Sequence, residues 1–421
     1  MSAVDAPGPS RFPRSEALLA RARERIPGLT FSMMKRPEVF APGRFPAYLA
    51  SGRGAEVEDV DGHRYVDFVC GLGATSLGHG HPQVLAAVQE VMDRGFLHSL
   101  PVELELQAAD ALVELIPGAE MARFFKTGAD ATSAAVRLAR ATTKKDRIIT
   151  VGYNGWHDHF MFDTPGVPAA LTPLTRRMPL FTPADEAPIL EAVAAGADDT
   201  AVVLLSLPYN RRVERPFLVA LREACTRAGV LLVFDEIVTG FRLAVGGAQQ
   251  HFDVAPDFAC FSKALAAGLP LSAVAGPRSA LEPMEQLQVS TTFGGETLSL
   301  AACVAALRVY RDTAYVDDIA RLGRRLAQGV DEASRRLGTP LVVVGYDCLP
   351  FFLFDRAPDR HAPLAREFVA LMAERGFLLR RDLNFICAAH TEAQIDAAIE
   401  AAERSLETMV EAGCFAGAEP R

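Results

Sequence analysis

The chain has 421 residues, of which 50% are hydrophobic and 23% charged, and its formal net charge is -9. The apolar content is sufficient for a large buried core and excludes a disordered or collagen-like chain, while the acidic balance argues against nucleic acid as the main partner. Seven cysteines without a C-x-x-C pair, a start without a secretory signal and the lack of any apolar run of about 18 residues predict a cytoplasmic protein with free thiols and no membrane partner.

The N-terminal part is predicted to contain a short helix followed by a β-meander. The helix covers residues 15–25 and is ended by Pro27 and Gly28. Residues 47–68 alternate between apolar and polar side chains, and Asp61-Gly62 within this stretch is a hairpin turn signal.

From about residue 82 to residue 276, predicted helices alternate with apolar strands. Two short apolar runs, 201–205 and 230–234, are typical of strands that are covered on both faces. A helical segment at 216–228 separates them. Strand, helix and strand in this order predict parallel neighbours joined by a right-handed crossover.

The C-terminal part mixes helices with predicted strands at 341–344 and 351–354 and ends in an amphipathic helix. We therefore expect an α/β fold whose mainly parallel sheet lies in a large domain, residues 82–312. A smaller α+β domain is expected from residues 1–81 and 313–421.

An acidic pair at the end of a strand is the most informative segment. The apolar run 231–234 leads directly into Asp235-Glu236, and the chain then turns at Gly240. Because ligands of open α/β sheets bind beyond the carboxyl ends of the strands, Asp235 is expected to point at a ligand crevice. An isolated acid at this place more often caps the next turn, so the functional interpretation depends on further residues.

A lone lysine supplies the second signal. Lys263 follows the apolar stretch 258–261 and precedes a turn at 268–270. Lysine is seldom buried unless it is paired or reactive, and burial favours the free amine that a Schiff base needs. Taken alone, Lys263 would more often be a surface residue.

The third signal is a group of small residues at the start of a predicted helix, 128–132. Gly128 and its small neighbours leave backbone N–H groups open to an anion, and the helix dipole adds to the attraction. Asp130 could equally be a simple N-terminal cap. Together the three segments offer a phosphate site, a carboxylate and a lysine, and these parts suit pyridoxal 5'-phosphate.

At this point a family resemblance can be stated. Residues 235–242 and 262–263 resemble the signature of class III pyridoxal-phosphate aminotransferases. Further matches at 77–82, 155–158 and 292–295 occur in the same order, so that nearly the whole chain is similar to the glutamate-1-semialdehyde aminomutase branch. The resemblance implies the fold-type-I architecture of aspartate aminotransferase.

The resemblance also implies roles at the cofactor ring. Lys263 would bind the cofactor as a Schiff base and move the substrate proton, and Asp235 would pair with the ring nitrogen and keep it protonated. Trp156 takes the position of the aromatic residue that stacks on one face of the ring, and Ile237 would pack on the other face.

Four more residues correspond to family positions around the phosphate and the phenolic oxygen. Gly128 and Ala129 would bind the phosphate through their backbone N–H groups, and Asn210 would lie near the phenolic oxygen. Thr292 corresponds to a threonine that reaches the phosphate of the neighbouring subunit. The resemblance therefore implies a homodimer with shared active sites.

Two other motifs give weaker functional signals, one for a metal site and one for a dinucleotide-binding loop. Histidines stand at alternate positions, 79 with 81 and 157 with 159, and this spacing is only a weak metal signal, so no metal site is expected. Residues 71–76 lack the third glycine of a dinucleotide loop, which disfavours a nicotinamide-dependent dehydrogenase.

The substrate-binding residues depart from the aminomutase pattern. Where that branch holds its substrate carboxylate with an arginine, this chain has Lys35, with Arg36 one residue further on. Lysine cannot form the bidentate fork of arginine. Asp382 is the nearest counterpart of a glutamate that the branch places late in the chain. A pocket with an acid and without the arginine predicts a neutral or cationic carbonyl acceptor.

We therefore expect an aminotransferase that uses a small-molecule amino donor and a carbonyl acceptor, the acceptor being an amino sugar in antibiotic biosynthesis, since relatives of that kind share this branch. Three alternatives stay open: an aminomutase that moves nitrogen within one molecule, an epimerase that uses the same cofactor, and a binding protein that has lost its catalysis.

Overall fold

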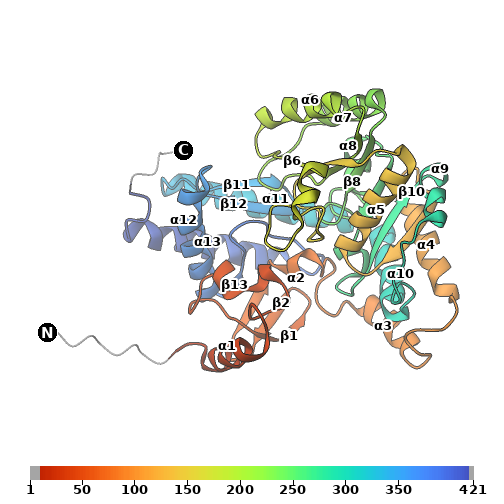
Figure 1. Ribbon diagram of the computed structural model, residues 1–421. Coiled ribbons are helices and arrows are strands. Elements are labelled where there is room, and N and C mark those ends of the chain that lie inside the picture. The colour runs from red at the N-terminus through yellow and green to blue at the C-terminus, as the bar shows by residue number, and fades with distance from the viewer. Residues whose placement is uncertain (1–9, 417–421) are drawn as a thin grey trace. The chain divides into compact units, whose positions relative to one another are not determined.

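The computed structural model describes residues 10–416, and the chain divides into two units (Figure 1). The buried apolar runs of the sequence form the central sheet of the larger unit. The larger unit contains residues 73–77 and 81–320. The smaller unit contains the described residues up to Leu72, Gly78–Gly80, and the described residues from Arg321 onward.

Seven strands build the sheet of the larger unit, in the order β4-β10-β9-β8-β7-β5-β6. All neighbours are parallel except β10, which runs antiparallel to both β4 and β9. The strands are β4 (Met121–Phe125), β5 (Arg147–Val151), β6 (Thr175–Met178), β7 (Thr200–Leu205), β8 (Leu231–Asp235), β9 (Phe258–Phe261) and β10 (Ser272–Gly276).

The two predicted central strands are confirmed as β7 and β8. Every residue of β7 is buried, as is every residue of β8 except the first. The predicted helix between them is α7 (Arg215–Ala228), and β7 and β8 are parallel as expected. The α/β class and the mainly parallel sheet are therefore confirmed.

Helices surround this sheet, and α5 (Gly128–Thr143) packs against five of its strands, β4, β7, β8, β9 and β10. Five alanines on its buried face allow this close approach. The other helices of the unit are α3 (Pro82–Met92), α4 (Glu103–Leu115), α6 (Glu186–Ala195), α8 (Gly247–Phe252), α9 (Arg278–Leu281) and α10 (Thr297–Asp312), with 3₁₀ turns η3 (Ala169–Leu174), η4 (Pro183–Asp185), η5 (Lys263–Ala266) and η6 (Glu282–Gln286). Helix α10 packs against α3, α4 and η5.

The smaller unit has a four-stranded sheet, β1-β2-β3-β13, and the hairpin β11-β12. Its first three strands form the predicted antiparallel meander, and β13 adds a parallel edge. Buried Asp59 fixes the predicted turn, because its carboxylate accepts hydrogen bonds from the backbone N–H groups of Asp61 and His63, each at 2.9 Å. The strands are β1 (Leu49–Arg53), β2 (Glu56–Asp59), β3 (Arg64–Asp67), β11 (Val342–Tyr346), β12 (Leu349–Leu353) and β13 (Phe377–Leu378).

The helices of the smaller unit are α1 (Pro13–Arg25), α12 (Pro358–Glu374) and α13 (Glu392–Glu411), with 3₁₀ turns η1 (Met33–Lys35) and η2 (Pro37–Val39). The turn α2 (Cys70–Gly73) has positive φ at all four residues. Helix α11 (Tyr315–Arg336) leads from the larger unit into the smaller one. Within residues 10–416, none of the helices has the length and apolar content that crossing a bilayer requires.

Candidate active site

Two strand ends bring the predicted catalytic residues to one edge of the sheet. Asp235 is the last residue of β8 and pairs with Cys260 of the neighbouring parallel strand β9. Lys263 begins the 3₁₀ turn η5, two residues after β9 ends. The carboxylate and the amine therefore both lie beyond the carboxyl ends of parallel strands, where open α/β sheets bind their ligands.

Asp235 is buried, with 4% of its surface exposed. One carboxylate oxygen, Oδ1, accepts a hydrogen bond from the backbone N–H of Ile237 at 3.1 Å, and Oδ2 accepts one from Nδ2 of Asn154 at 2.9 Å. Burial raises the pKa of this carboxyl group to about 6, while both hydrogen bonds and the charge on Lys263 act in the opposite direction. Only a few partners therefore offset the cost of keeping this carboxylate ionised.

The Lys263 side chain is half-buried. Burial lowers the pKa of its amine to about 8, an effect that the negative charge of Asp235 opposes and the positive charge of Arg242 increases. An amine with a pKa of about 8 is free in roughly a tenth of molecules near neutral pH, far more often than an ordinary lysine, and Schiff-base chemistry requires this free form. The backbone of Lys263 has φ +48°, in the left-handed region, and the next carbonyl, that of Ala264, accepts a hydrogen bond from the Tyr310 hydroxyl at 2.7 Å.

The start of α5 lies against the same strand end. Thr127 caps the helix: its hydroxyl accepts from the N–H of Asp130 at 3.2 Å, and the Asp130 carboxylate accepts from the N–H of Thr127 at 2.8 Å. Asp130 is therefore a cap, one of the two interpretations that the sequence left open. Gly128 is required by close packing, since a Cβ there would lie 2.6 Å from Cδ1 of Ile237.

A loop that follows β5 completes this group. Its Gly155 has φ +124°, and a Cβ there would lie 3.1 Å from the Cα of Ala129. Trp156 is 67% exposed and meets His157 edge to face, with 4.9 Å between ring centroids. Tyr153 is 65% exposed by area, yet the pKa of its phenol is raised by partial burial and by the negative charge of Asp235.

Sequence reasoning missed Tyr153 and Asn154. They follow β5 directly, and the rule that was applied to Asp235, to look beyond the carboxyl end of a parallel strand, could have found them. Trp156, two residues further along the same loop, was selected by resemblance alone.

Two buried acceptor atoms near these strand ends lack a partner. Among the described residues, neither Oδ1 of Asn154 nor Oδ1 of Asn210 has a hydrogen-bonding partner. Buried polar atoms are rarely left unsatisfied, and such atoms call for a specific explanation. A polar ligand would supply donors here. Together with the helix start, the carboxylate and the amine, these atoms fit a phosphorylated pyridine cofactor.

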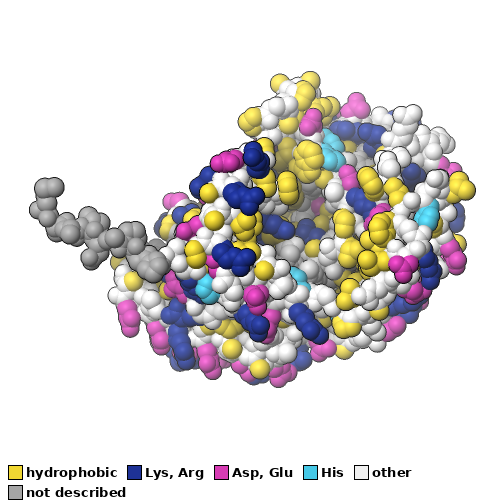
Figure 2. Space-filling model, turned by 90° about the horizontal axis from the view of Figure 1, so that it is seen from below, with side chains coloured by type: hydrophobic (Ala, Val, Ile, Leu, Met, Phe, Trp, Pro, Cys, Tyr) yellow, Lys and Arg dark blue, Asp and Glu magenta, His cyan; other side chains and the backbone are white. Residues whose placement is uncertain are grey.

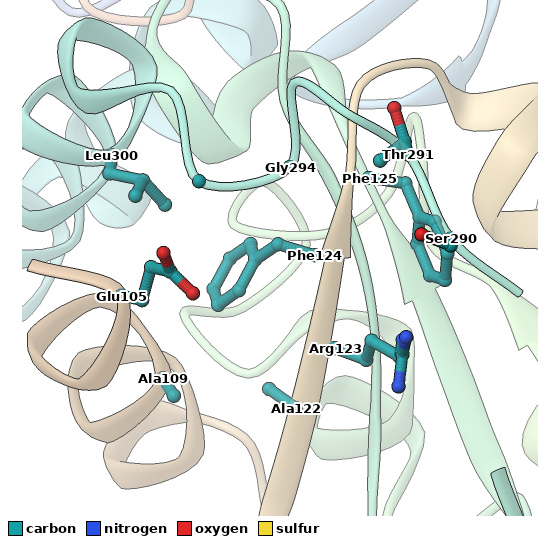
Figure 3. A pocket seen from close by; sticks show the side chains of 11 residues that line it. Glu105, Ala109, Ala122, Arg123, Phe124, Phe125, Ser290, Thr291, Gly294 and Leu300 are labelled. Carbon is teal, nitrogen blue, oxygen red and sulfur yellow. The ribbon is translucent and has the colours of Figure 1, made fainter. Parts of the chain in front are cut away.

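Thr292 lies on an exposed loop between η6 and α10. Loop residues 290–291 and 294–295 line a pocket of about 380 Å³ together with α4 and β4, and Figure 3 shows Glu105 of α4 and Phe124 of β4 facing this space. Neither Lys263 nor Asp235 lines this pocket. Within a single chain, Thr292 is therefore presented to the surface.

The predicted substrate residues belong to the smaller unit. Lys35 is exposed and lines a mostly apolar cavity of about 440 Å³ within that unit. The guanidinium of Arg36 packs over Gly28, where a Cβ would lie 2.4 Å from its Nη2. Asp382 forms a two-pronged ion pair with Arg380, at 2.7 and 2.8 Å. Asp382 is thus an acid that already has a cationic partner.

Histidines 157 and 159 share one neighbour, the hydroxyl group of Ser133. Nδ1 of His157 lies 2.6 Å from the Ser133 hydroxyl, and Nε2 of His159 lies 3.4 Å from it. Among residues 10–416, no group of three or more His, Cys, Asp or Glu side chains is arranged to hold a metal ion.

Comparisons with known proteins agree with this geometry. Over 93% of this chain and 99% of the other, the sequence is 33% identical to glutamate-1-semialdehyde 2,1-aminomutase of Methanothermobacter thermautotrophicus. It is 30% identical to 3-aminobutyryl-CoA aminotransferase of Cloacimonas acidaminovorans, over 94% of this chain and 97% of that one.

The fold is similar to that of the FumI protein of Sphingopyxis sp. MTA144, solved in its pyridoxal-phosphate internal aldimine form, with a TM-score of 0.89, 27% identity and coverage of 97% of this chain and 98% of that chain. The sequence model of the family "Aminotransferase class-III" matches residues 40–167 and 211–345. This chain therefore belongs to the class III aminotransferases, which are pyridoxal-phosphate-dependent enzymes of fold type I.

Proposed function

We propose that the protein transfers an amino group from a small-molecule donor to the carbonyl group of an acceptor that lacks a recognised carboxylate, and that the acceptor is an amino sugar. The observation that carries the aminotransferase part is the meeting of Asp235 and Lys263 at one sheet edge, each with a pKa displaced by burial. Such displaced pairs are typical of catalytic groups.

Each residue would have a separate task. Lys263 would bind the cofactor covalently and later carry a proton to and from the substrate carbon, since its amine is easily deprotonated. Asp235 would hold a proton on the ring nitrogen. The first backbone N–H groups of α5, at Gly128 and Ala129, have no partners within the helix and would bind the phosphate. When bound, the cofactor supplies a ring that accepts the electron pair left by a departing substrate proton.

The remaining contacts would fix the ring. Ile237, which packs on Gly128, would cover one face. Trp156 is the proposed aromatic cover on the other face. The neighbouring Tyr153 is a second candidate, because the negative charge of Asp235 raises the pKa of its phenol. Asn210 would use its unpartnered Oδ1 near the phenolic oxygen of the cofactor.

Arg380 of the smaller unit supports an acceptor without a carboxylate. Its guanidinium group is paired with Asp382, whereas Nε of Arg36 is buried without a hydrogen-bond partner among the described residues. The Asp382 side chain is nevertheless 45% exposed, which leaves it accessible to a cationic group. An overall charge of -9 would also attract a polycationic amino sugar.

The named relatives favour a second candidate. Glutamate-1-semialdehyde 2,1-aminomutase is the name of one protein that is 33% identical to this chain, so intramolecular amino transfer is the alternative, with an epimerase reaction as a third outcome. Lys35 would then hold the substrate carboxylate as a single charge.

A half-reaction assay separates these functions. Candidate amines, among them glutamate, are mixed one at a time with purified enzyme, and the release of a keto acid is measured with the loss of the cofactor's Schiff-base absorption. An aminotransferase releases keto acid from its donor. Turnover of glutamate-1-semialdehyde without keto acid, and without amine formed on an oxidised aminoglycoside, would replace the amino-sugar proposal by the aminomutase.

A homodimer is the proposed assembly. Apolar side chains are exposed on and between α3 and α4 of the single chain, namely Leu85, Met92, Phe96, Leu97, Leu100 and Leu106, and Figure 2 shows hydrophobic side chains at the surface between charged ones. Exposed apolar side chains that occur together on one segment are typical of an interface. Exposed Thr292 would reach the phosphate of the second copy. Sedimentation with and without cofactor tests this, and a monomer with full cofactor occupancy would contradict it.

A cytoplasmic location is proposed from the cysteines, because all seven are reduced and six are buried.

A further inference from the structure

The side chain of Asn154 faces a carboxylate in the interior of the larger unit. It is 2% exposed, and its Nδ2 donates to Oδ2 of Asp235, a residue 81 positions later in the chain. An ionised carboxylate can only accept, so the amide nitrogen of Asn154 must face it and the amide oxygen must face away. That oxygen is the buried acceptor that has no partner among the described residues.

The loop that carries Asn154 is anchored without this side chain. The backbone carbonyl of Asn154 accepts a hydrogen bond from the Thr132 hydroxyl of α5 at 2.7 Å. The next residue, Gly155, packs directly on Ala129. Because main-chain contacts hold the loop, the side chain of Asn154 is available for another task.

That task concerns the carboxylate of Asp235. Its Oδ1 is held by the backbone of Ile237 and its Oδ2 by Asn154. Each carboxylate oxygen can accept about two hydrogen bonds, so one acceptor position on each stays available to a ligand. The two donors fix the orientation of the group, and each of them stabilises its charged form.

We propose that Asn154 is a positioning residue for amino transfer, which holds Asp235 ionised and oriented so that the cofactor's ring nitrogen, and not the carboxyl group, keeps the shared proton. This inference rests on the proposed pairing of Asp235 with that nitrogen. It adds a residue that neither contacts the substrate carbon nor carries charge, and yet decides where a proton resides.

Without Asn154, few of the titratable groups around Asp235 would favour its ionised form. Lys263 on η5 favours the ionised carboxylate. Glu236 on the same strand end, Cys260 on β9 and Tyr153 on the β5 loop are each coupled unfavourably to the charge of Asp235. With burial already raising the pKa of Asp235 to about 6, loss of one donor moves it toward neutral pH.

The first test observes the proton directly. The enzyme is loaded with cofactor that carries ¹⁵N at the ring nitrogen, and its chemical shift is followed from about pH 6 to about pH 9 in wild type and in Asn154→Leu. The share of the proton on the nitrogen relative to the carboxyl group is expected to fall by about tenfold or more, because a hydrogen bond to a charged group is worth roughly one to two pKa units. An unchanged nitrogen shift across this pH range would overturn the inference.

The second test uses the cofactor-free protein. The folded-state pKa of Asp235 lies above its unfolded value, so its ionisation lowers stability as pH rises from the unfolded pKa to the folded one. Asn154→Leu raises the folded pKa further and extends this loss above about pH 6. The melting temperature should match wild type near pH 5 and fall below it near pH 8. Parallel melting curves for the two proteins at both pH values would contradict the proposal.

A matched control exists on the same strand end. Thr239 donates to buried Glu236 at 2.5 Å, as Asn154 donates to Asp235. Thr239→Val should show a similar loss of cofactor-free stability at high pH, since burial raises the pKa of Glu236 to about 7, but it should leave the nitrogen titration unchanged. Should Asn154→Leu fold poorly, Asn154→Ala removes the same donor with a smaller side chain and must lower the nitrogen's share of the proton in the same way.

Asp235→Asn separates this inference from the proposed function. If the nitrogen keeps its proton in Asp235→Asn, the pairing itself is wrong and the site assignment fails. If Asp235→Asn removes the proton and Asn154→Leu does not, only the role of Asn154 is refuted.

Discussion

The strand ends of the larger unit and the Arg380–Asp382 pair of the smaller unit differ in whether their buried polar groups have hydrogen-bonding partners. Beyond the ends of β5 and β7, two buried amide oxygens, those of Asn154 and Asn210, have no partner in the described structure. Arg380, whose side chain is only 5% exposed, is satisfied by Asp382 and by the carbonyl of Met34 at 3.1 Å. The first region needs a ligand to complete it, whereas the second is complete as folded.

The largest effect is expected at the amine. Lys263→Ala should abolish turnover, because in the proposed site no other group forms the covalent bond to the cofactor. The protein should still bind cofactor through the phosphate contacts, and borohydride should no longer fix it to the chain. Mass spectrometry of the reduced protein checks this, and covalent label on another lysine would refute the assignment.

Asp235→Asn comes next in size. It preserves the shape of the side chain and removes its charge, so the ring nitrogen should lose its proton. Turnover should fall by about a hundredfold or more, which is the lower range for loss of a catalytic electrostatic contact. Steady-state kinetics measures it. Near-normal turnover would mean that Asp235, like Asp130, only caps a turn.

A smaller effect is expected where α5 meets Ile237. Gly128→Ala places a Cβ 2.6 Å from Cδ1 of Ile237 and should push this side chain out of position, weakening cofactor binding by about tenfold. Ile237→Val removes the clashing atom, so the double variant should bind cofactor more tightly than Gly128→Ala alone. Titration of the cofactor-free proteins measures this, and no recovery in the double variant would argue against the contact.

The smallest effect tests the completed pair. Asp382→Asn leaves the Arg380 guanidinium without a charged partner and should cost about 1–2 kcal/mol of unfolding free energy, between the values for exposed and fully buried pairs. If Asp382 also attracts a cationic acceptor, KM should rise more than kcat falls. Denaturant unfolding and kinetics are measured on the same samples; a loss of stability with unchanged KM would assign Asp382 to the fold alone.

Much of the central fold could be predicted because a strand that is buried on both faces has an uninterrupted apolar sequence. Residues 201–205 of β7 and 231–234 of β8 are all apolar, and this pattern has few other interpretations. The direction of β10 could not be predicted in this way. Its sequence, Ser-Ala-Val-Ala-Gly, is as apolar as a parallel strand, and only its partners β4 and β9 decide that it runs antiparallel.

The site, like the fold, could be predicted from sequence only where local patterns indicate its residues. Asp235 and Lys263 were identified because each follows an apolar run, and their proposed roles stay predictions. The hydrogen bond from Asn154 joins residues 81 positions apart, and no local pattern indicates it. The ion pair of Asp382 with Arg380 joins residues only two positions apart, so local sequence could have indicated it.

The left-handed backbone at Lys263 has a consequence for engineering. An L-residue in this region costs about 1–2 kcal/mol, and glycine avoids that cost. Lys263→Gly should therefore yield a cofactor-free protein that melts at a higher temperature than the native one. A library screened only for thermal tolerance would therefore favour loss of the reactive amine, so any stabilisation of this enzyme has to be selected with the cofactor attached.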